Sequence, residues 1–215
     1  MRPLLESVVE SVAAARAAEH AGAARLELCV GLADGGVTPP GGLITAVLER
    51  VSIPVFVLIR PRAGDFVYSD AEIADALRGV AMARRRGAHG IVLGVLGRDG
   101  CVDVDRTRRL VDRGRGLPAT FHRAFDAVPD QEAALEDAIA AGASRVLTSG
   151  GAATALEGAG RLAALAHQAR GRITVLAGGG VRPHNVQALL ARSGVREVHA
   201  RFENEAGTRA LADLL

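Results

Sequence analysis

The sequence contains no lysine, because all 26 residues counted as Lys or Arg are arginine. A Schiff-base mechanism needs an amine that can lose its proton, and a guanidinium group cannot do so. The absence of lysine therefore excludes lysine-dependent aldolase chemistry.

Cysteine and long apolar runs are also scarce. The two cysteines, Cys29 and Cys101, form neither a CxxC motif nor a disulfide framework. Glu6 and Glu10 interrupt the first apolar stretch, which argues against a signal peptide. No run approaches the roughly 18 apolar residues that a membrane span needs. We expect a soluble cytoplasmic protein with reduced thiols and no membrane partner.

The charges are nearly balanced, with a formal net charge of +2 over 215 residues. This balance does not predict a nucleic-acid partner, despite a pI of about 8.9. A hydrophobic content of 49% is enough for a sizeable core. No linker or low-complexity stretch divides the chain, so we expect a single domain over residues 1–215.

Short β-branched runs alternate with alanine-rich and charged segments along the whole chain. The strand-like runs are LLESVV (4–9), RLELCV (25–30), PVFVLIRP (54–61), GIVLGVL (90–96), PATFHRAF (118–125), RVLTSG (145–150), ITVLAGG (173–179) and EVHAR (197–201). Eight strands that are each followed by a helix predict an α/β protein, a compact (β/α)8 TIM barrel. An open doubly wound sheet would more typically show GxGxxG after its first strand, where this chain has ESVVESV.

The segments between the strands carry helix signals. Ile73, Leu77 and Val80 fall on one face of a helix, and Ser69 with Glu72 has the form of a capping box. Glycines are placed like C-terminal caps at Gly22, Gly87, Gly142, Gly171 and Gly194.

Alternation along a barrel strand decides which side chains enter the interior. In RLELCV the apolar residues Leu26 and Leu28 should face the helices, so Glu27 and Cys29 should point inward. The same rule turns polar residues inward at two later strands: Thr120, His122 and Asp126, then Glu197, His199 and Arg201. Polar groups at strand ends are expected because such barrels build their sites at the C-terminal mouth.

These segments also carry a family resemblance. RLELCVGLADGGVTP, IPVFVLIRPRAGDFVYSDAE, GIVLGVLGRDGCVDVDRTRRL, PATFHRAFD, RVLTSGG, VLAGGGVRPHNV and EVHAR resemble, in order, the motifs of the copper homeostasis protein CutC family. The resemblance implies a cytoplasmic TIM barrel, a link to copper as cofactor or bound ion, and self-association as a homodimer or larger homo-oligomer. Many bacterial relatives have cysteines after the first-strand glutamate, where this chain has Ser7 and Val8.

A copper site would depend on sulfur, because Cu(I) prefers thiolate or thioether ligands. The chain offers only Cys29, Cys101, Met1 and Met82, on four separate segments. Cys29 is the candidate metal ligand, and Cys101 could meet it at the mouth. The alternative is that Cys29 is a small buried residue, as free cysteines often are.

Acid–base chemistry draws on more residues. Glu6, Glu27 and His122 should point into the barrel, where burial shifts pKa values in the way that proton transfer uses, so they are the candidate catalytic residues. Together with His199 they could also hold a divalent cation. Alternatively, some of them form a hydrogen-bonded network that fills the barrel, since buried charges must be paired.

Anion binding is predicted from arginines and glycines at strand ends. Arg60 and Arg62 follow the third strand, and two guanidinium forks suit phosphate or carboxylate. Glycine-rich TSGG and AGGG follow strands six and seven, although such glycines can simply make tight turns. The candidate substrate-binding residues are Arg60, Arg62, Asp65, Asp126, Ser149, Gly150, Gly178, Gly179 and His199. The expected partner is a small anionic molecule, with phosphorylated molecules among the candidates.

Overall fold

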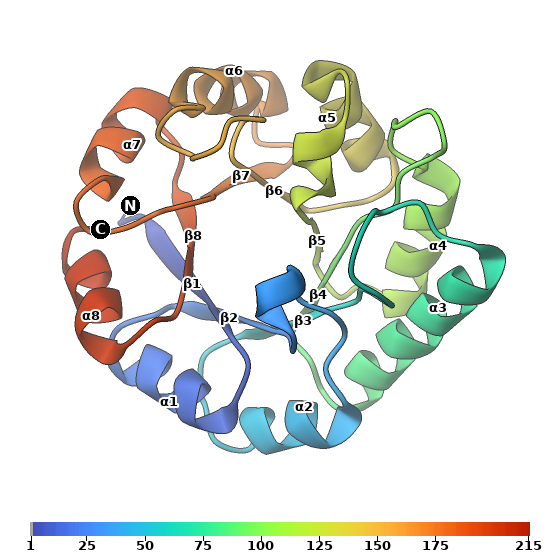
Figure 1. The fold of residues 1–215 in the computed structure, drawn as a ribbon, viewed down its shortest axis with the longest axis horizontal. Coiled ribbons are helices and arrows are strands. Elements are labelled where there is room, and N and C mark those ends of the chain that lie inside the picture. The colour runs from blue at the N-terminus through green and yellow to red at the C-terminus, as the bar shows by residue number, and fades with distance from the viewer. Residues whose placement is uncertain (1) are drawn as a thin grey trace.

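The computed structural model describes residues 2–215 and contains a closed barrel of eight parallel strands in chain order (Figure 1). The strands are β1 (Leu4–Val9), β2 (Arg25–Leu28), β3 (Val55–Leu58), β4 (Gly90–Leu93), β5 (Ala119–Phe121), β6 (Arg145–Thr148), β7 (Thr174–Gly178) and β8 (Glu197–Arg201). The predicted compact (β/α)8 TIM barrel is confirmed, and each of the eight strands lies within the run that the sequence predicts.

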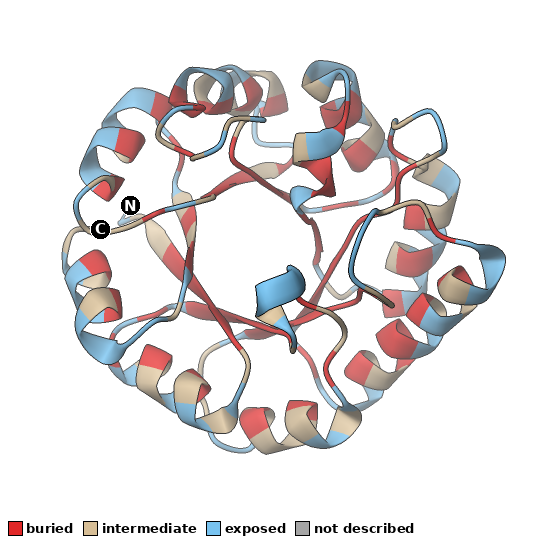
Figure 2. Cartoon of the chain, viewed as in Figure 1, coloured by how far each residue is buried: buried red, intermediate tan, exposed pale blue. Residues whose placement is uncertain are grey.

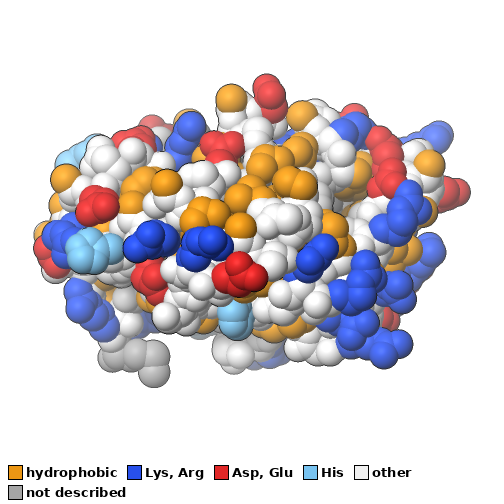
Figure 3. All heavy atoms as spheres, turned by 90° about the horizontal axis from the view of Figure 1, so that it is seen from below, with side chains coloured by type: hydrophobic (Ala, Val, Ile, Leu, Met, Phe, Trp, Pro, Cys, Tyr) orange, Lys and Arg blue, Asp and Glu red, His pale blue; other side chains and the backbone are white. Residues whose placement is uncertain are grey.

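Eight helices surround the barrel, and their inner faces are buried against the strands (Figure 2). They are α1 (Val12–His20), α2 (Gly41–Leu48), α3 (Asp70–Arg85), α4 (Val104–Gly114), α5 (Gln131–Ala140), α6 (Ala159–Ala169), α7 (Val186–Ser193) and α8 (Glu205–Asp213). No helix in the described chain is long and apolar enough to cross a membrane. On the face drawn in Figure 3, arginine side chains lie among acidic and apolar ones, as the small net charge leads us to expect.

The strand alternation has the predicted direction. Leu26 and Leu28 of β2 pack in the outer core beneath the helices, with Ile44 and Ile73. Cys29 packs in a separate cluster inside the barrel. Apolar side chains therefore fill the space between sheet and helices, while the inward-facing polar side chains lie in the barrel interior beside the smaller cluster that contains Cys29.

Helix signals in the sequence also correspond to the structure. Ser69 and Glu72 form a capping box at the start of α3, in which each side chain bonds the other residue's backbone N–H. Gly142 and Gly194 follow helices with positive φ angles of 87° and 68°, a conformation that glycine adopts without a Cβ penalty.

Most strands end earlier than the sequence predicts, and the residues beyond their ends leave the sheet. β5 ends at Phe121, and a 3-10 helix, η2 (Arg123–Ala127), follows it. Asp126 therefore lies on η2 and not on the strand, so its predicted inward strand position is wrong. β3 ends at Leu58, which places Arg60 and Arg62 in the following loop.

Phe56 fills the barrel interior against two buried arginines. The guanidinium carbons of Arg25 and Arg145 lie 5.1 and 5.4 Å from the centroid of its ring. Gly90 is paired with Phe56 in the neighbouring strand, where a Cβ would lie 2.5 Å from the ring carbons. Glycine at this position leaves the space that the aromatic ring occupies.

Candidate active site

The described chain has a pocket of about 390 Å³ at the C-terminal mouth of the barrel. Its wall comes from the ends of strands far apart in the sequence, as the barrel architecture requires. The polar side chains that line it are Glu27, Arg60, His122, Arg123, Arg182, His199 and Arg201. Val8, Leu58, Phe66 and Leu147 add apolar lining that suits a carbon skeleton.

A continuous chain of ionic contacts runs through the barrel interior toward this pocket. Arg145 Nε contacts Glu197 Oε2 at 2.7 Å, and the same oxygen accepts from Arg25 at 2.6 Å. Arg25 also pairs with Glu6, which is fully buried. Glu6 Oε1 in turn lies 2.8 Å from His199 Nδ1, and His199 lines the pocket. We call these five residues the interior ion chain.

The contacts within the interior ion chain shift the pKa values of Glu6 and His199. Burial alone would raise the pKa of Glu6, but the hydrogen bond from His199 and the charge of Arg25 lower it to about 2. Burial alone would lower the pKa of His199, but its bond to Glu6 and the nearby Glu27 carboxylate raise it above its ordinary value. Glu6 is therefore an anion that bonds His199 Nδ1 and favours the protonated form of that imidazole. It does not line the pocket, so it acts beneath the site and not within it.

Glu27 does not belong to the interior ion chain. Among the described residues its buried Oε2 has no hydrogen-bond partner, and His199 Nδ1 lies 4.0 Å away. Burial raises the pKa of Glu27 to about 7, with His199 opposing the shift. A carboxyl group that changes protonation near neutral pH can both take and return a proton.

His122 presents a neutral imidazole to the same pocket. Burial and then the charge of Arg60 lower its pKa to about 3. The backbone N–H of Ala124 donates to Nδ1 at 3.2 Å, which assigns the ring proton to Nε2. Nε2 is buried without a partner in the described chain, and the Phe66 ring lies 4.9 Å from the imidazole between ring centroids. His122 can therefore donate a hydrogen bond, but it is a poor base.

Arg60 holds a loop across the barrel mouth. Its guanidinium donates to the carbonyl oxygens of Asp34, Gly36 and Gly64 at 3.2, 2.9 and 2.7 Å. The first two belong to the segment of the short 3-10 helix η1 (Leu32–Asp34), which lies over the barrel centre in Figure 1. Carbonyl partners leave the charge of Arg60 uncompensated, so it contributes positive potential to the pocket that it lines.

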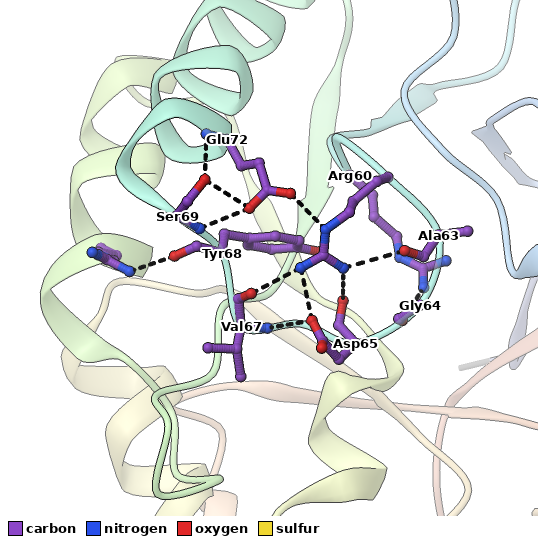
Figure 4. Close-up of polar contacts among 10 residues, drawn as sticks. Arg60, Ala63, Gly64, Asp65, Val67, Tyr68, Ser69 and Glu72 are labelled. Atoms are coloured by element: carbon purple, nitrogen blue, oxygen red, sulfur yellow. Dashed lines mark hydrogen bonds and ion pairs between the residues drawn. The ribbon is translucent and has the colours of Figure 1, made fainter.

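Arg62 does not reach the mouth, contrary to the expectation that both arginines would do so. It pairs with Asp65 at 2.8 Å and with Glu72 at 2.5 Å, and its guanidinium carbon lies 5.3 Å from the centroid of the Tyr68 ring. Figure 4 shows Asp65, Tyr68 and Glu72 on the loop that leads into α3. Neither Arg62 nor Asp65 lines the pocket. Two carboxylates neutralise this guanidinium, and these two ion pairs order the loop between β3 and α3.

The TSGG segment after β6 already holds an internal anion. The Asp126 carboxylate accepts hydrogen bonds from Thr148 Oγ1 at 2.5 Å, from the Ser149 N–H at 3.0 Å and from the Gly151 N–H at 3.2 Å. Gly150 N–H donates to Thr148 Oγ1 instead. These donors are therefore occupied, and Asp126, Ser149 and Gly150 do not line the pocket.

At the end of β7 the glycines have different roles. Gly178 has no room for a side chain, because a Cβ would lie 2.5 Å from Leu147 and 3.3 Å from His199. Gly179 lines the pocket together with Gly180. The backbone at this point can approach a ligand closely.

Sequence reasoning missed three arginines of the pocket as site residues: Arg123, Arg182 and Arg201. Arg201 carried a signal, because strand alternation already turned it inward. Arg123 begins the 3-10 helix η2 and Arg182 lies in the irregular segment after β7, and strand alternation gives no direction at either position.

The sulfur atoms of the described chain do not fit a Cu(I) site. Cys29 is fully buried within the inner apolar cluster and does not line the pocket, and burial, followed by the Glu27 and Glu10 charges, raises its pKa to about 12. Cys101 is exposed on a separate loop, and Met82 lies on α3, near Gly41 of α2. Met1 lies outside the described residues. Cu(I) selects clustered soft ligands, and none are clustered here.

Glu6, Glu27 and His199 form a group with potential metal-ligand atoms within 4.8 Å of one another. Glu6 already bonds Arg25 and His199 with its two oxygens. A cation would therefore compete with the proton on His199, and the group is better described as a proton-holding cluster.

These features define a (β/α)8 barrel with an arginine-rich pocket at its mouth. The sequence profile of the CutC family matches residues 3–204. A CutC family protein of Xanthomonas axonopodis pv. citri is 50% identical over 196 residues, which cover 91% of this chain and 82% of that protein. The human copper homeostasis protein cutC homolog is 47% identical over 208 residues, 96% of this chain and 76% of its own. The chain belongs to the CutC family.

A solved structure supports the same assignment. The crystal structure of a CutC protein from Streptococcus agalactiae matches with a TM-score of 0.87 and 33% sequence identity. The match covers 92% of this chain and 97% of that one. The whole barrel is therefore shared with that protein.

Proposed function

We propose that this protein is a cytoplasmic enzyme that transfers protons on a small anionic molecule, with Glu27 as the acid–base group. The observation that carries the proposal is the unpartnered Glu27 carboxyl, whose pKa is about 7, beside a pocket rich in arginine. The link to copper homeostasis comes from the names of the relatives. Self-association as a homodimer or larger homo-oligomer stays a prediction from the family resemblance.

The chemistry follows from the protonation states of the two unpartnered groups. Ionised Glu27 takes a proton from a carbon atom next to a carbonyl group, so a C–H bond breaks and an O–H bond forms on Glu27. The electron pair moves to the carbonyl oxygen, where the neutral His122 Nε2–H donates a hydrogen bond. Return of the proton from Glu27 to carbon completes a step without net oxidation. A neutral imidazole is the better partner here, because it stabilises the oxyanion without losing its proton.

The charge of the pocket supports an anionic substrate. Four arginines and His199 line it, against Glu27 as its one carboxylate among the described residues. Glu6 raises the pKa of His199, which favours its cationic form and so adds to the positive potential. Such a cleft concentrates anions and increases their association rate.

Solvent deuterium exchange tests the proposed proton transfer. Small anionic carbonyl compounds that raise the melting temperature of the native protein would be incubated with it in D2O, and mass spectrometry would detect deuterium bound to carbon. We expect incorporation with the native protein and a loss of at least about 100-fold with Glu27→Gln, because general acid–base groups contribute about 10²–10⁴-fold.

Glu49→Gln provides the control, because Glu49 is exposed and lies on the helix side of the barrel at the end of α2. It should leave the exchange rate unchanged. Equal exchange rates in the native protein and Glu27→Gln would remove Glu27 as the base. Binding without exchange by any ligand would favour a carrier over an enzyme.

Copper binding through Cys29 is the second candidate, and the names of the relatives favour it. The Cys29 thiol, with its pKa of about 12 and its full burial, opposes it. We therefore expect weak Cu(I) binding that is equal in the native protein and in Cys29→Ser, measured against a competing chelator under reducing conditions. Cys101→Ser tests the exposed thiol in parallel. Tight binding of one Cu(I) per chain that Cys29→Ser abolishes would contradict this expectation.

A further inference from the structure

We propose that the pocket wall between β7 and β8 is a phosphate subsite, formed by the backbone of residues 179–181 and the guanidinium of Arg201. The substrate is then a small phosphate monoester whose carbon skeleton extends toward Glu27 and His122. This inference rests on the proposed function for the reacting end of the molecule, but the phosphate subsite can be tested separately.

Three consecutive backbone donors at the end of β7 are free. Gly179, Gly180 and Val181 all line the pocket, and their N–H groups have no acceptor among residues 2–215. Gly179 and Gly180 have φ angles of +112° and +69°, so the chain turns here in a conformation that L side chains rarely adopt. Successive N–H groups in such a turn make a concave site for an anion.

Arg201 is the available cation at this point. The other pocket arginines have partners: Arg60 bonds three carbonyl oxygens, Arg123 pairs with Asp126 at 2.7 Å, and Arg182 pairs with Glu203 at 2.5 Å. Arg201, at the end of β8, is exposed, and its guanidinium has no hydrogen bond or ion pair within the described chain. The pairing of Gly178 with His199 brings the ends of these two strands together.

At the end of the neighbouring strand β6, a carboxylate of the protein itself occupies a similar set of donors. After β6, Asp126 accepts the hydrogen bonds of Ser149 and Gly151 and also binds Arg123. After β7 no carboxylate of the described residues takes the equivalent place beside residues 179–181. The same combination of free N–H groups and a guanidinium is therefore open to a ligand.

Phosphate fits this combination better than a carboxylate does. A phosphate monoester has three peripheral oxygens and up to two negative charges, so it can accept from several N–H groups and from the arginine fork at once. Backbone donors at strand and helix ends are a common way for proteins to bind phosphate. A carboxylate has two oxygens and would leave part of this donor set without an acceptor.

The test uses inorganic phosphate, titrated calorimetrically at constant ionic strength into the native protein, Arg201→Gln and Arg192→Gln. Arg192 is the matched control, because it is an exposed arginine on α7 that does not line the pocket. We expect saturable binding of one phosphate per chain to the native protein. Affinity should fall about tenfold or more in Arg201→Gln, from loss of a charge-assisted hydrogen bond, and stay unchanged in Arg192→Gln. Acetate should bind more weakly than phosphate.

Absence of saturable phosphate binding, or an equal loss of affinity in the two variants, would overturn the subsite. Glu27→Gln separates this inference from the proposed function, because it should retain phosphate binding while it loses deuterium exchange. Exchange that depends on Glu27 in a protein with no phosphate affinity would overturn the subsite alone. Phosphate affinity without any Glu27-dependent exchange would leave the subsite and remove the proposed reaction.

Discussion

Replacement of Arg25 by leucine is expected to lower the free energy of unfolding by about 3–5 kcal/mol, the usual cost of removing one partner from a buried ion pair. The Arg25 side chain is only 5% exposed and bridges Glu6 and Glu197 inside the barrel. Leucine would leave the buried Glu6 and the half-buried Glu197 with fewer donors, and would also remove one of the two cations over the Phe56 ring. Urea denaturation at neutral pH measures the change.

Two further variants identify the cause. Arg50→Leu removes an arginine that is half exposed and paired with Glu49, so it should change stability by no more than about 0.5 kcal/mol. The double variant Arg25→Leu with Glu6→Gln should recover part of the loss, because it removes one of the stranded charges. If Arg25→Leu were as stable as the native protein, the interior ion chain would contribute nothing measurable to folding.

Strand periodicity was sufficient to predict the barrel, because every strand must seal an apolar layer beneath the helices. Leu26 and Leu28 face that layer, so the direction of Glu27 follows without further information. The same rule turned His122 and His199 toward the interior, and the structure brings them and Glu27 to one pocket. These residues could be predicted because they lie on strands or directly beyond a strand end.

Loop residues could not be placed in this way. Arg60 and Arg62 are two positions apart after β3, yet one holds the η1 segment and the other pairs with Asp65 and Glu72. The path of each loop depends on which carbonyl or carboxylate group lies within reach, and periodicity does not carry that information. Asp126 shows the same limit, because η2 turns its carboxylate toward the donors that follow β6.

The ion pairs inside the barrel could not be predicted from the sequence either. Arg25 and Arg145 begin their strands, where they could have been solvent-exposed residues at the N-terminal rim. Only the closed barrel brings both to Glu197, which belongs to the last strand. Long-range pairing of this kind follows from barrel closure and cannot be derived from any local motif.

The stability of the native protein relative to Glu27→Gln is expected to fall by roughly 2 kcal/mol between pH 5 and pH 8. The pKa of Glu27 is about 7 in the folded protein against an ordinary value of 4.5, so the folded state holds this proton more tightly than the unfolded state does. Stability from Glu27 is therefore present at low pH and is lost as pH rises through the interval between these two values. Glutamine does not titrate, so subtraction of the two denaturation curves gives the contribution of this carboxyl together with its effect on His199.

The same ionisation should govern the proposed chemistry. Deuterium exchange by the native protein should increase with pH and level off above an apparent pKa near 7, because only ionised Glu27 accepts a proton. His122, with its pKa of about 3, should not contribute a second inflection in this range. A stability difference that stays flat from pH 5 to pH 8 would show that Glu27 is already ionised at low pH. It would then be a weaker base, unsuited to abstracting a proton from carbon at neutral pH, and the acid–base role would have to be assigned elsewhere.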